Sequence, residues 1–276
     1  MLNAVYAPRR KQRLCSRTST PATISTTPHT GSSGSPWRTP NTLRCGRPSS
    51  SEHLLSELRA TLAQCASYGL DPRVHSSDYQ GVVDHAVIDA LRTWSASNAG
   101  KTLLPTGIKA RNLNPIFTGL STLTLGWWGY LVDGATAHFP SINTKSERLA
   151  AGKGPIGSRA IVPASYWREF QKPSKALHHL SLPGNDLLGL AAVTRRGRTA
   201  DGQEYTCYSL VMQPAADHIS DIHDRMPLLI PAGFAEEWLT SLAPAGQLID
   251  AARGASQQLA TAIVGTRQGA AAEPLS

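Results

Sequence analysis

Five short apolar runs between residues 122 and 212 constrain the fold more than any other feature of the sequence. Each is only long enough for a single strand, and Gly184-Asn185 and Asp201-Gly202 supply turns between neighbouring runs. Short strands joined by tight turns favour antiparallel pairing. The runs are Thr122 to Leu131, Arg159 to Ala164, Leu177 to Leu182, Leu187 to Thr194 and Tyr205 to Met212.

Helical patterns flank these runs. An apolar stripe with serines before it predicts a helix over residues 51–68, which Gly69 ends, and a similar stripe predicts a second helix over residues 78–95. An early proline and spaced apolar residues predict a third helix over residues 231–242. The expected class is therefore α+β, with a curved, mainly antiparallel sheet and peripheral helices.

The ends of the chain differ from its middle. Residues 1–50 hold eight basic residues, no acid and many Ser, Thr and Pro, so we expect disorder there. This extension could be a nucleic-acid-binding arm, a transit-like peptide or an upstream segment outside the working protein; we favour the last. We expect one domain over residues 51–252 and a fraying Gly/Ala-rich tail over residues 253–276.

Composition excludes several classes of protein. No apolar run approaches the roughly 18 residues that span a bilayer, so we expect no membrane partner. The cysteines are scattered and form no CxxC pair, which argues against zinc and against a disulfide scaffold. We therefore expect a reducing, cytoplasmic setting, no cofactor and no metal. The bases outside residues 1–50 balance the acids, so bulk charge identifies no partner for the body.

The densest chemical signal is the stretch Ser220-Asp221-Ile222-His223-Asp224-Arg225-Met226-Pro227. It puts a histidine, carboxylates and a guanidinium between two apolar runs. We expect these groups at a strand end, where a rigid sheet can aim them at a ligand. The alternative is a solvated turn with a local Asp–Arg pair.

Four further stretches accompany it: Cys45-Gly46-Arg47, Arg111 to Pro115 ahead of Trp128-Gly129-Tyr130, Ser141 to Glu147, and Arg159 to Ala164 continuing into Tyr166 to Phe170. In this order and spacing, the five stretches resemble the SOS-response-associated peptidase family, also called abasic-site processing proteins. The resemblance covers about residues 112–239. It implies a barrel-like sheet, a groove for single-stranded DNA and no cofactor; we also expect a monomer, associated with the nucleoid.

The resemblance further implies a chemistry. A cysteine with a free α-amine attacks the aldehyde of an abasic deoxyribose, and its amine and thiol close a thiazolidine ring that crosslinks protein to DNA. The matching residues here are Cys45 as nucleophile, assisted by Asn143, Glu169 and His223. The implied DNA contacts are Arg47, Asn112, Lys145, Arg159 and Arg225.

Several departures from the family pattern bear on this reading. The family cysteine follows the initiator Met, whereas Cys45 is internal, and its backbone nitrogen is an amide that cannot form an imine. Either the chain is cut after Arg44, or translation starts elsewhere, or the crosslinking chemistry is absent. Lys145 stands where the family commonly has Arg, Ser165-Tyr166 replaces Asp-Gly, and the tryptophan pair after Trp-Gly-Tyr is missing.

Each site residue also has a plainer interpretation. Glu169 could be a surface carboxylate paired with Arg168 or Lys172, His223 a turn histidine and Asn143 a turn former. Two rival functions follow. The chain could be a non-catalytic remnant that only binds single-stranded DNA, or a cysteine peptidase that uses Cys45 or Cys207 with His223.

Overall fold

Five strands close into a barrel at the centre of the computed structural model, which describes residues 67–73, 79, 81–98, 113–139, 141–154 and 156–268. They are β2 (Leu113–Gly119), β3 (Thr122–Trp128), β7 (Ser158–Ala164), β10 (Leu188–Arg198) and β11 (Glu204–Pro214). Antiparallel pairing runs from β3 through β2, β7 and β10 to β11, and a parallel contact between β11 and β3 closes the ring. The expected barrel-like, mainly antiparallel α+β fold is confirmed.

The barrel interior is tightly filled. Ile116, Leu190 and Tyr208 are completely buried in one cluster. Gly126 lies among them, because a Cβ atom there would come within 2.7 Å of Ile116 and 2.9 Å of Tyr208. The Tyr208 hydroxyl lies 2.6 Å from the Tyr68 hydroxyl, so a polar contact is also enclosed in this core.

A second antiparallel sheet extends the same core. Its strands, in spatial order, are β1 (Ser67–Gly69), β8 (Tyr166–Phe170), β9 (Leu177–Ser181) and β13 (Val264–Arg267). Trp167 of β8 and Leu180 of β9 belong to the cluster that fills the barrel. The sheet that carries Glu169 is therefore packed directly on the barrel core.

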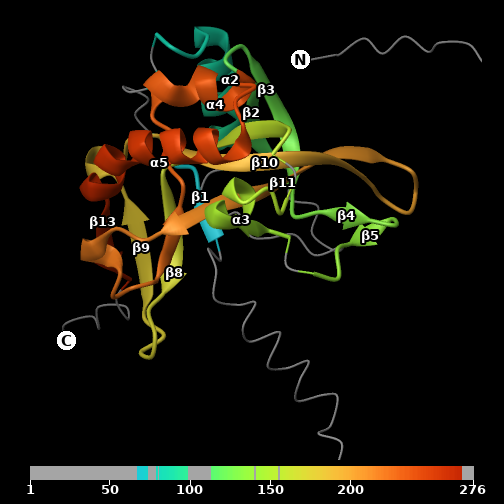
Figure 1. Cartoon of the computed structure of the whole chain (residues 1–276). Helices are drawn as coiled ribbons and strands as arrows, with labels where there is room; N and C mark the ends of the chain where they lie inside the picture. The colour runs from blue at the N-terminus through green and yellow to red at the C-terminus, as the bar shows by residue number, and fades with distance from the viewer. Residues whose placement is uncertain are drawn as a thin grey trace, which may run out of the picture. The chain divides into compact units, whose positions relative to one another are not determined.

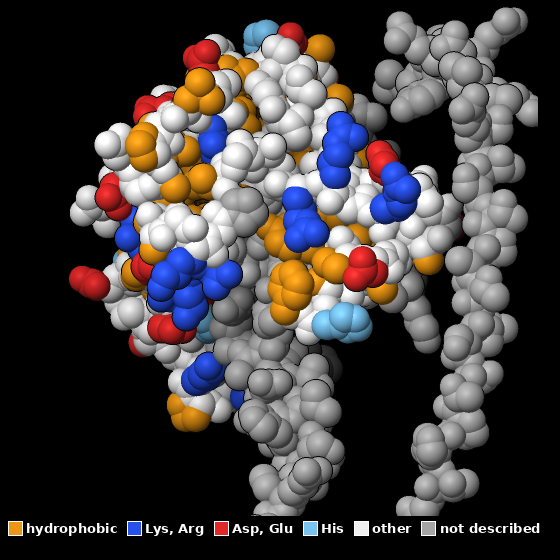
Figure 2. All heavy atoms as spheres, turned by 45° about the vertical axis from the view of Figure 1, so that its right-hand side comes forward, with side chains coloured by type: hydrophobic (Ala, Val, Ile, Leu, Met, Phe, Trp, Pro, Cys, Tyr) orange, Lys and Arg blue, Asp and Glu red, His pale blue; other side chains and the backbone are white. Residues whose placement is uncertain are grey.

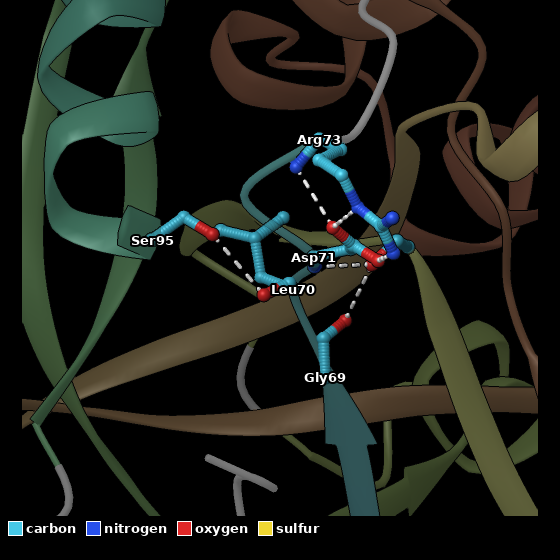
Figure 3. Close-up of polar contacts among 6 residues, drawn as sticks. Gly69, Leu70, Asp71, Arg73 and Ser95 are labelled. Atoms are coloured by element: carbon cyan, nitrogen blue, oxygen red, sulfur yellow. Dashed lines mark hydrogen bonds and ion pairs between the residues drawn. The ribbon is translucent and has the colours of Figure 1, made fainter. Parts of the chain in front are cut away.

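Hydrogen bonds anchor the chain where it leaves β1 (Figure 3). Ser95 donates to the Leu70 carbonyl at 3.1 Å, and the Arg73 amide and guanidinium both contact the Asp71 carboxylate. The Ser165 hydroxyl accepts from the Asp71 amide at 2.6 Å and donates to the Gly69 carbonyl at 3.3 Å. Ser165 thus ties the β7–β8 junction to β1.

Helices cover the outer surface of the barrel (Figure 1). These are α2 (His85–Ser97), α4 (Ala235–Thr240) and α5 (Ala245–Ala262), with the short helix α3 (Ser146–Ala150) beside α5. Val193 of β10 and Trp238 of α4 share the buried cluster between sheet and helices. No helix in the described part of the chain combines the length and apolar character needed to cross a bilayer.

The remaining elements are short. They are the strands β4 (Leu131–Val132), β5 (Ala135–Thr136), β6 (Asn143–Lys145) and β12 (Arg225–Pro227), and the 3-10 turns η1 (Pro183–Asn185), η2 (Asp217–Ile219) and η3 (Ala232–Phe234). Two of these strands matter for the site, since β6 and β12 both pair with the last residues of β11.

The structure corrects several predicted helix boundaries. Residues 67–68, expected to end the first helix, lie in β1, and residues 51–66 lie outside the described part. The second helix begins at His85 and not at residue 78, because the Asp84 side chain accepts a hydrogen bond from the Ala86 amide at 2.8 Å and caps it. The third divides into η3 and α4, which ends at Thr240 and leaves Leu242 99% exposed.

The fraying expected from residue 253 is wrong for the described residues up to 268. Helix α5 continues to Ala262, and β13 follows it. Small buried residues explain this extension, because Ala252, Ser256 and Ala260 let the helix approach the barrel closely. The Ser256 hydroxyl also accepts a hydrogen bond from the Leu229 amide at 3.2 Å.

Candidate active site

Glu169 projects from β8 into the protein interior. Alternate side chains of a strand point to opposite faces, and Glu169 shares its face with the fully buried Trp167. Only 2% of the Glu169 surface is exposed, and its Oε1 atom has no hydrogen-bond partner among the described residues. The alternative of a surface carboxylate is therefore wrong.

The surroundings of Glu169 favour its protonated form. Burial raises the pKa of Glu169 well above the usual value of a glutamate, and the negative charge of Asp224 raises this pKa further. A carboxyl group that keeps its proton near neutral pH can donate it to a departing hydroxyl. Asp224 belongs to the His223 motif, so two stretches more than 50 residues apart in sequence interact here.

His223 is buried between η2 and β12. Its Nδ1 atom lies 3.1 Å from the amide nitrogen of Arg225, 3.2 Å from the carbonyl oxygen of Arg225 and 3.3 Å from an Asp224 carboxylate oxygen. The amide N–H can only donate, whereas the carbonyl and the carboxylate accept, so Nδ1 has a partner in either neutral tautomer; with the Arg225 amide as donor, the ring carries its proton on Nε2. These contacts of Nδ1 with the local backbone orient the imidazole ring.

Arg225 is held in an ion-pair cluster. Its guanidinium lies 2.7 Å from the Glu147 Oε1 atom, which also accepts from Arg253 of α5 at 2.9 Å. Desolvation acts to raise the pKa of Glu147, but its own backbone N–H and the two guanidinium groups outweigh it, so the pKa is lowered. This carboxylate links α3, which directly follows β6, to the His223 segment and to α5.

Asn143 and Lys145 line a cleft of about 620 Å³ beside α3, called the Asn143 cleft below. The cleft is basic and partly aromatic. Its lining residues are Tyr130, Phe139, Ser141, Asn143, Thr144, Lys145, Arg148, Leu149, Gly154, Val193, Arg195 and Ser209. Positive side chains beside aromatic rings suit an anionic ligand with flat groups, such as a nucleic-acid strand.

The pairing of β11 brings these motifs to one region. Its residue Met212 pairs with Lys145 of β6 on one edge and with Pro227 of β12 on the other. Because β6 and β12 lie on opposite edges of β11, they are two strand spacings apart, a distance of about 10 Å. The His223 motif, expected at a strand end, follows β11 and continues into β12, which begins at Arg225.

One predicted DNA contact has a structural role. Arg159 is only 9% exposed, and its guanidinium donates to the backbone carbonyls of Trp238, Ile156 and Ser241, the last two at 2.9 and 2.5 Å. The bonds to Trp238 and Ser241 cap the end of α4, so the expected phosphate contact from Arg159 does not agree with its placement. Cys45, Arg47 and Asn112 lie outside the described residues.

The structure gives no support to Cys207 as a nucleophile. Its thiol is buried beside Trp127 and Leu131, and burial raises its pKa. A thiol kept protonated and away from solvent reacts slowly, because the thiolate is the reactive form.

Sequence reasoning missed two parts of this site. The Glu147–Arg253 pair joins residues far apart in sequence, so no local pattern reveals it. The guanidinium carbon of Arg195 lies 4.9 Å from the Tyr130 ring centroid, a cation–π contact between β10 and the connection from β3 to β4. The only available signal for Arg195 was the cluster of three arginines within residues 195–198.

Together, the fold and site define a closed-barrel α+β domain with an acid–histidine cluster near a basic cleft. Residues 116–268, more than half of the chain, match the family model described as "SOS response associated peptidase (SRAP)". The chain belongs to this family.

Curated relatives cover only part of the chain. The abasic site processing protein YobE of Bacillus subtilis is 30% identical over 109 residues, which are 37% of this chain and 49% of YobE. The abasic site processing protein YoqW of the same organism is 29% identical over 100 residues, covering 35% and 44%. The chain therefore spans about half the length of the curated relatives it matches.

Solved structures share the fold at low identity. A crystal structure from Bordetella bronchiseptica has a TM-score of 0.52 and 16% identity, covering 75% of this chain and 100% of that one. One from Bacteroides thetaiotaomicron has a TM-score of 0.53 and 13% identity, covering 74% and 91%. These similarities concern the fold alone.

Proposed function

We propose that this chain processes abasic sites in single-stranded DNA by forming a covalent crosslink through Cys45, in the cellular response to DNA damage. Relatives named abasic site processing proteins support the substrate class. The observation that carries the chemistry is the buried Glu169 carboxyl, whose pKa is raised by burial and by Asp224. We further propose that the working protein is a monomer associated with the nucleoid in the cytoplasm.

The reaction requires Cys45 to become N-terminal. In the proposed peptidase step, water adds to the carbonyl carbon of Arg44 and the bond to the Cys45 nitrogen breaks, which frees an α-amine. That amine attacks the C1 aldehyde of the abasic sugar and loses water to give an imine. The thiol then adds to the imine carbon, its proton goes to the nitrogen, and a five-membered thiazolidine ring closes.

Glu169 suits the dehydration step. The departing hydroxyl group needs a proton, and a carboxyl whose pKa is raised by burial and by Asp224 keeps its proton to higher pH than an exposed glutamate and can supply it. His223, with a proton on Nε2, can hydrogen-bond the opened sugar, while Asn143 orients the amine. Lys145, which is exposed in the Asn143 cleft, neutralises a neighbouring phosphate. Arg225 stays a predicted phosphate contact.

Intact mass and a crosslinking assay test the proposal. Purified protein is weighed to learn whether the chain begins at Cys45, and it is then incubated with a single-stranded oligonucleotide carrying one abasic site. We expect a band shift that survives denaturing electrophoresis for the form beginning at Cys45, and none for the 276-residue chain.

A Cys45→Ser variant with the same start is the matched control. Its amine can still form an imine that borohydride traps, but no thiol stabilises the product. If the form beginning at Cys45 binds DNA only in a salt-sensitive, non-covalent manner, the chain is instead a non-catalytic DNA-binding member of the family.

A further inference from the structure

The β10–β11 hairpin carries a cluster of arginines towards its tip. Arg195, Arg196 and Arg198 all lie in the last four residues of β10, before the turn that leads to Glu204 (Figure 1). The side chains of Arg196 and Arg198 are 90% and 64% exposed. These charges are therefore available to a partner and do not support the core.

Arg195 joins this hairpin to the candidate active site. Its guanidinium lies over the ring of Tyr130, and both side chains line the Asn143 cleft. Arg195 also lines a second cleft of about 410 Å³, the hairpin cleft, which is formed by residues 131–134, residues 195–199 and Glu204. Arg195 therefore lies at the boundary of both clefts.

A third cleft meets the same arginine. It has a volume of about 550 Å³ and is lined by Arg195 and Arg196, by the carbonyl-bound Arg159, and by six hydroxyl side chains that can donate to phosphate oxygens. The hydroxyl residues are Thr118, Thr122, Thr124, Ser158, Thr194 and Thr206.

The charge balance along this path is positive. The Asn143 cleft contributes Lys145 and Arg148, while in the hairpin cleft three arginines face the two carboxylates of Asp133 and Glu204. Glu204 is shared, since its oxygens lie 2.6 Å from Arg198 and 3.6 Å from Arg196. Figure 2 shows one face of the molecule, on which Lys and Arg side chains form several separate patches, some of them beside hydrophobic groups. Such spacing suits an extended polyanion.

We propose that the β10–β11 hairpin is a second DNA contact, which holds the phosphate backbone of the single strand as it leaves the Asn143 cleft. This inference rests on the proposed function for the identity of the polymer. The strand passes Tyr130 and Arg195 and reaches Arg196 and Arg198, so the hairpin extends the length of DNA that the protein covers beyond the reacting sugar.

The test uses the full chain and intact single-stranded DNA, so it does not depend on crosslinking. Fluorescence anisotropy measures affinity at several salt concentrations for an oligonucleotide of about 30 nucleotides. For the double variant Arg196→Ala/Arg198→Ala, we expect the slope of log K against log salt to decrease by about 1.4, because each lost phosphate contact contributes about 0.7.

Two further variants sharpen the test. Glu204→Gln releases both arginines from a carboxylate, so we expect DNA affinity to rise about two- to fivefold. Arg92→Ala removes an exposed arginine that is also ion-paired, to Asp89 at 3.4 Å, but that lines none of the three clefts, and it should change nothing. An unchanged slope in the double variant, or weaker binding by Glu204→Gln, would overturn the inference.

The outcomes separate this inference from the proposed function. Hairpin variants that weaken DNA binding in a protein without any crosslinking activity would overturn the proposed chemistry and support the hairpin contact. Intact crosslinking with unchanged DNA binding in every hairpin variant would support the proposed chemistry and overturn the hairpin contact.

Discussion

At the scale of single residues, burial decides what Glu169 can do. The same side chain at the surface would be ionised at neutral pH and could only accept hydrogen bonds. Because Glu169 is buried and lies near Asp224, its protonated form is favoured, and the carboxyl group can donate a proton. The neighbouring His223 is oriented by the backbone of Arg225, which separates the roles of the two groups.

The first prediction concerns Glu169→Gln. The variant should lose the proton donor and slow crosslink formation by about 10²- to 10⁴-fold. In the unmodified protein, the crosslinking rate should fall as pH rises through the raised pKa of Glu169. Rates measured by quenched denaturing electrophoresis across pH check both results; a variant that crosslinks as fast as the parent would contradict the assigned role.

The Glu169→Gln substitution, which should slow the reaction, should have the opposite effect on stability. Because the folded pKa of Glu169 lies above its unfolded value, its contribution to stability is complete below about pH 4.3 and is lost as pH rises towards the folded pKa. Glutamine does not titrate, so Glu169→Gln should gain stability relative to the parent as pH increases. Urea unfolding of both proteins at acidic and neutral pH measures this difference.

At the scale of secondary-structure elements, two arginines that were both predicted to contact DNA have different structural roles. Arg159 donates to two backbone carbonyls at the end of α4 and to the Ile156 carbonyl, whereas Arg225 pairs with Glu147 at the site. A carbonyl at a helix end lacks an intrahelical partner, so a buried guanidinium is a suitable donor for it.

Arg159→Ala should therefore act on stability and not on DNA recognition. Loss of hydrogen bonds from a buried charged group to carbonyls that stay buried should lower the free energy of unfolding by about 3 kcal/mol. Denaturant unfolding checks this value, and anisotropy with single-stranded DNA at a temperature where the variant stays folded should show unchanged affinity. A variant of full stability with weakened binding would restore the phosphate-contact interpretation.

At the scale of the whole molecule, closure of the barrel depends on how closely β3 approaches the interior side chains. Gly126 pairs with Thr206 where β3 and β11 run parallel, and no space exists for a larger residue between Ile116 and Tyr208. The same closure positions β11, whose last residues hold β6 and β12 together.

Gly126→Ala should thus cost about 1–3 kcal/mol of unfolding free energy by overpacking the barrel. Gly254→Ala is the matched control, because Gly254 is exposed in α5 and its added Cβ would contact nothing within 4 Å. That variant should instead gain about 0.5–1 kcal/mol from helix propensity. Equal effects of the two substitutions, measured by denaturant unfolding, would contradict this view of the core.

Local sequence patterns and family motifs alone were sufficient to predict the fold class, the family and several candidate site residues. Alternating apolar runs and Gly-containing turns predicted four of the five barrel strands, and β9 of the second sheet, since side-chain period and turn geometry are local properties. They did not predict β2, the fifth barrel strand. The five motifs indicated the family and singled out Asn143, Glu169 and His223. Only the tertiary structure decided that Glu169 is buried beside Asp224, that Arg159 caps a helix, and that Arg195 connects the hairpin to the Asn143 cleft. These features depend on contacts between residues far apart in sequence, and dielectric environment and ion pairing arise only when the chain is folded.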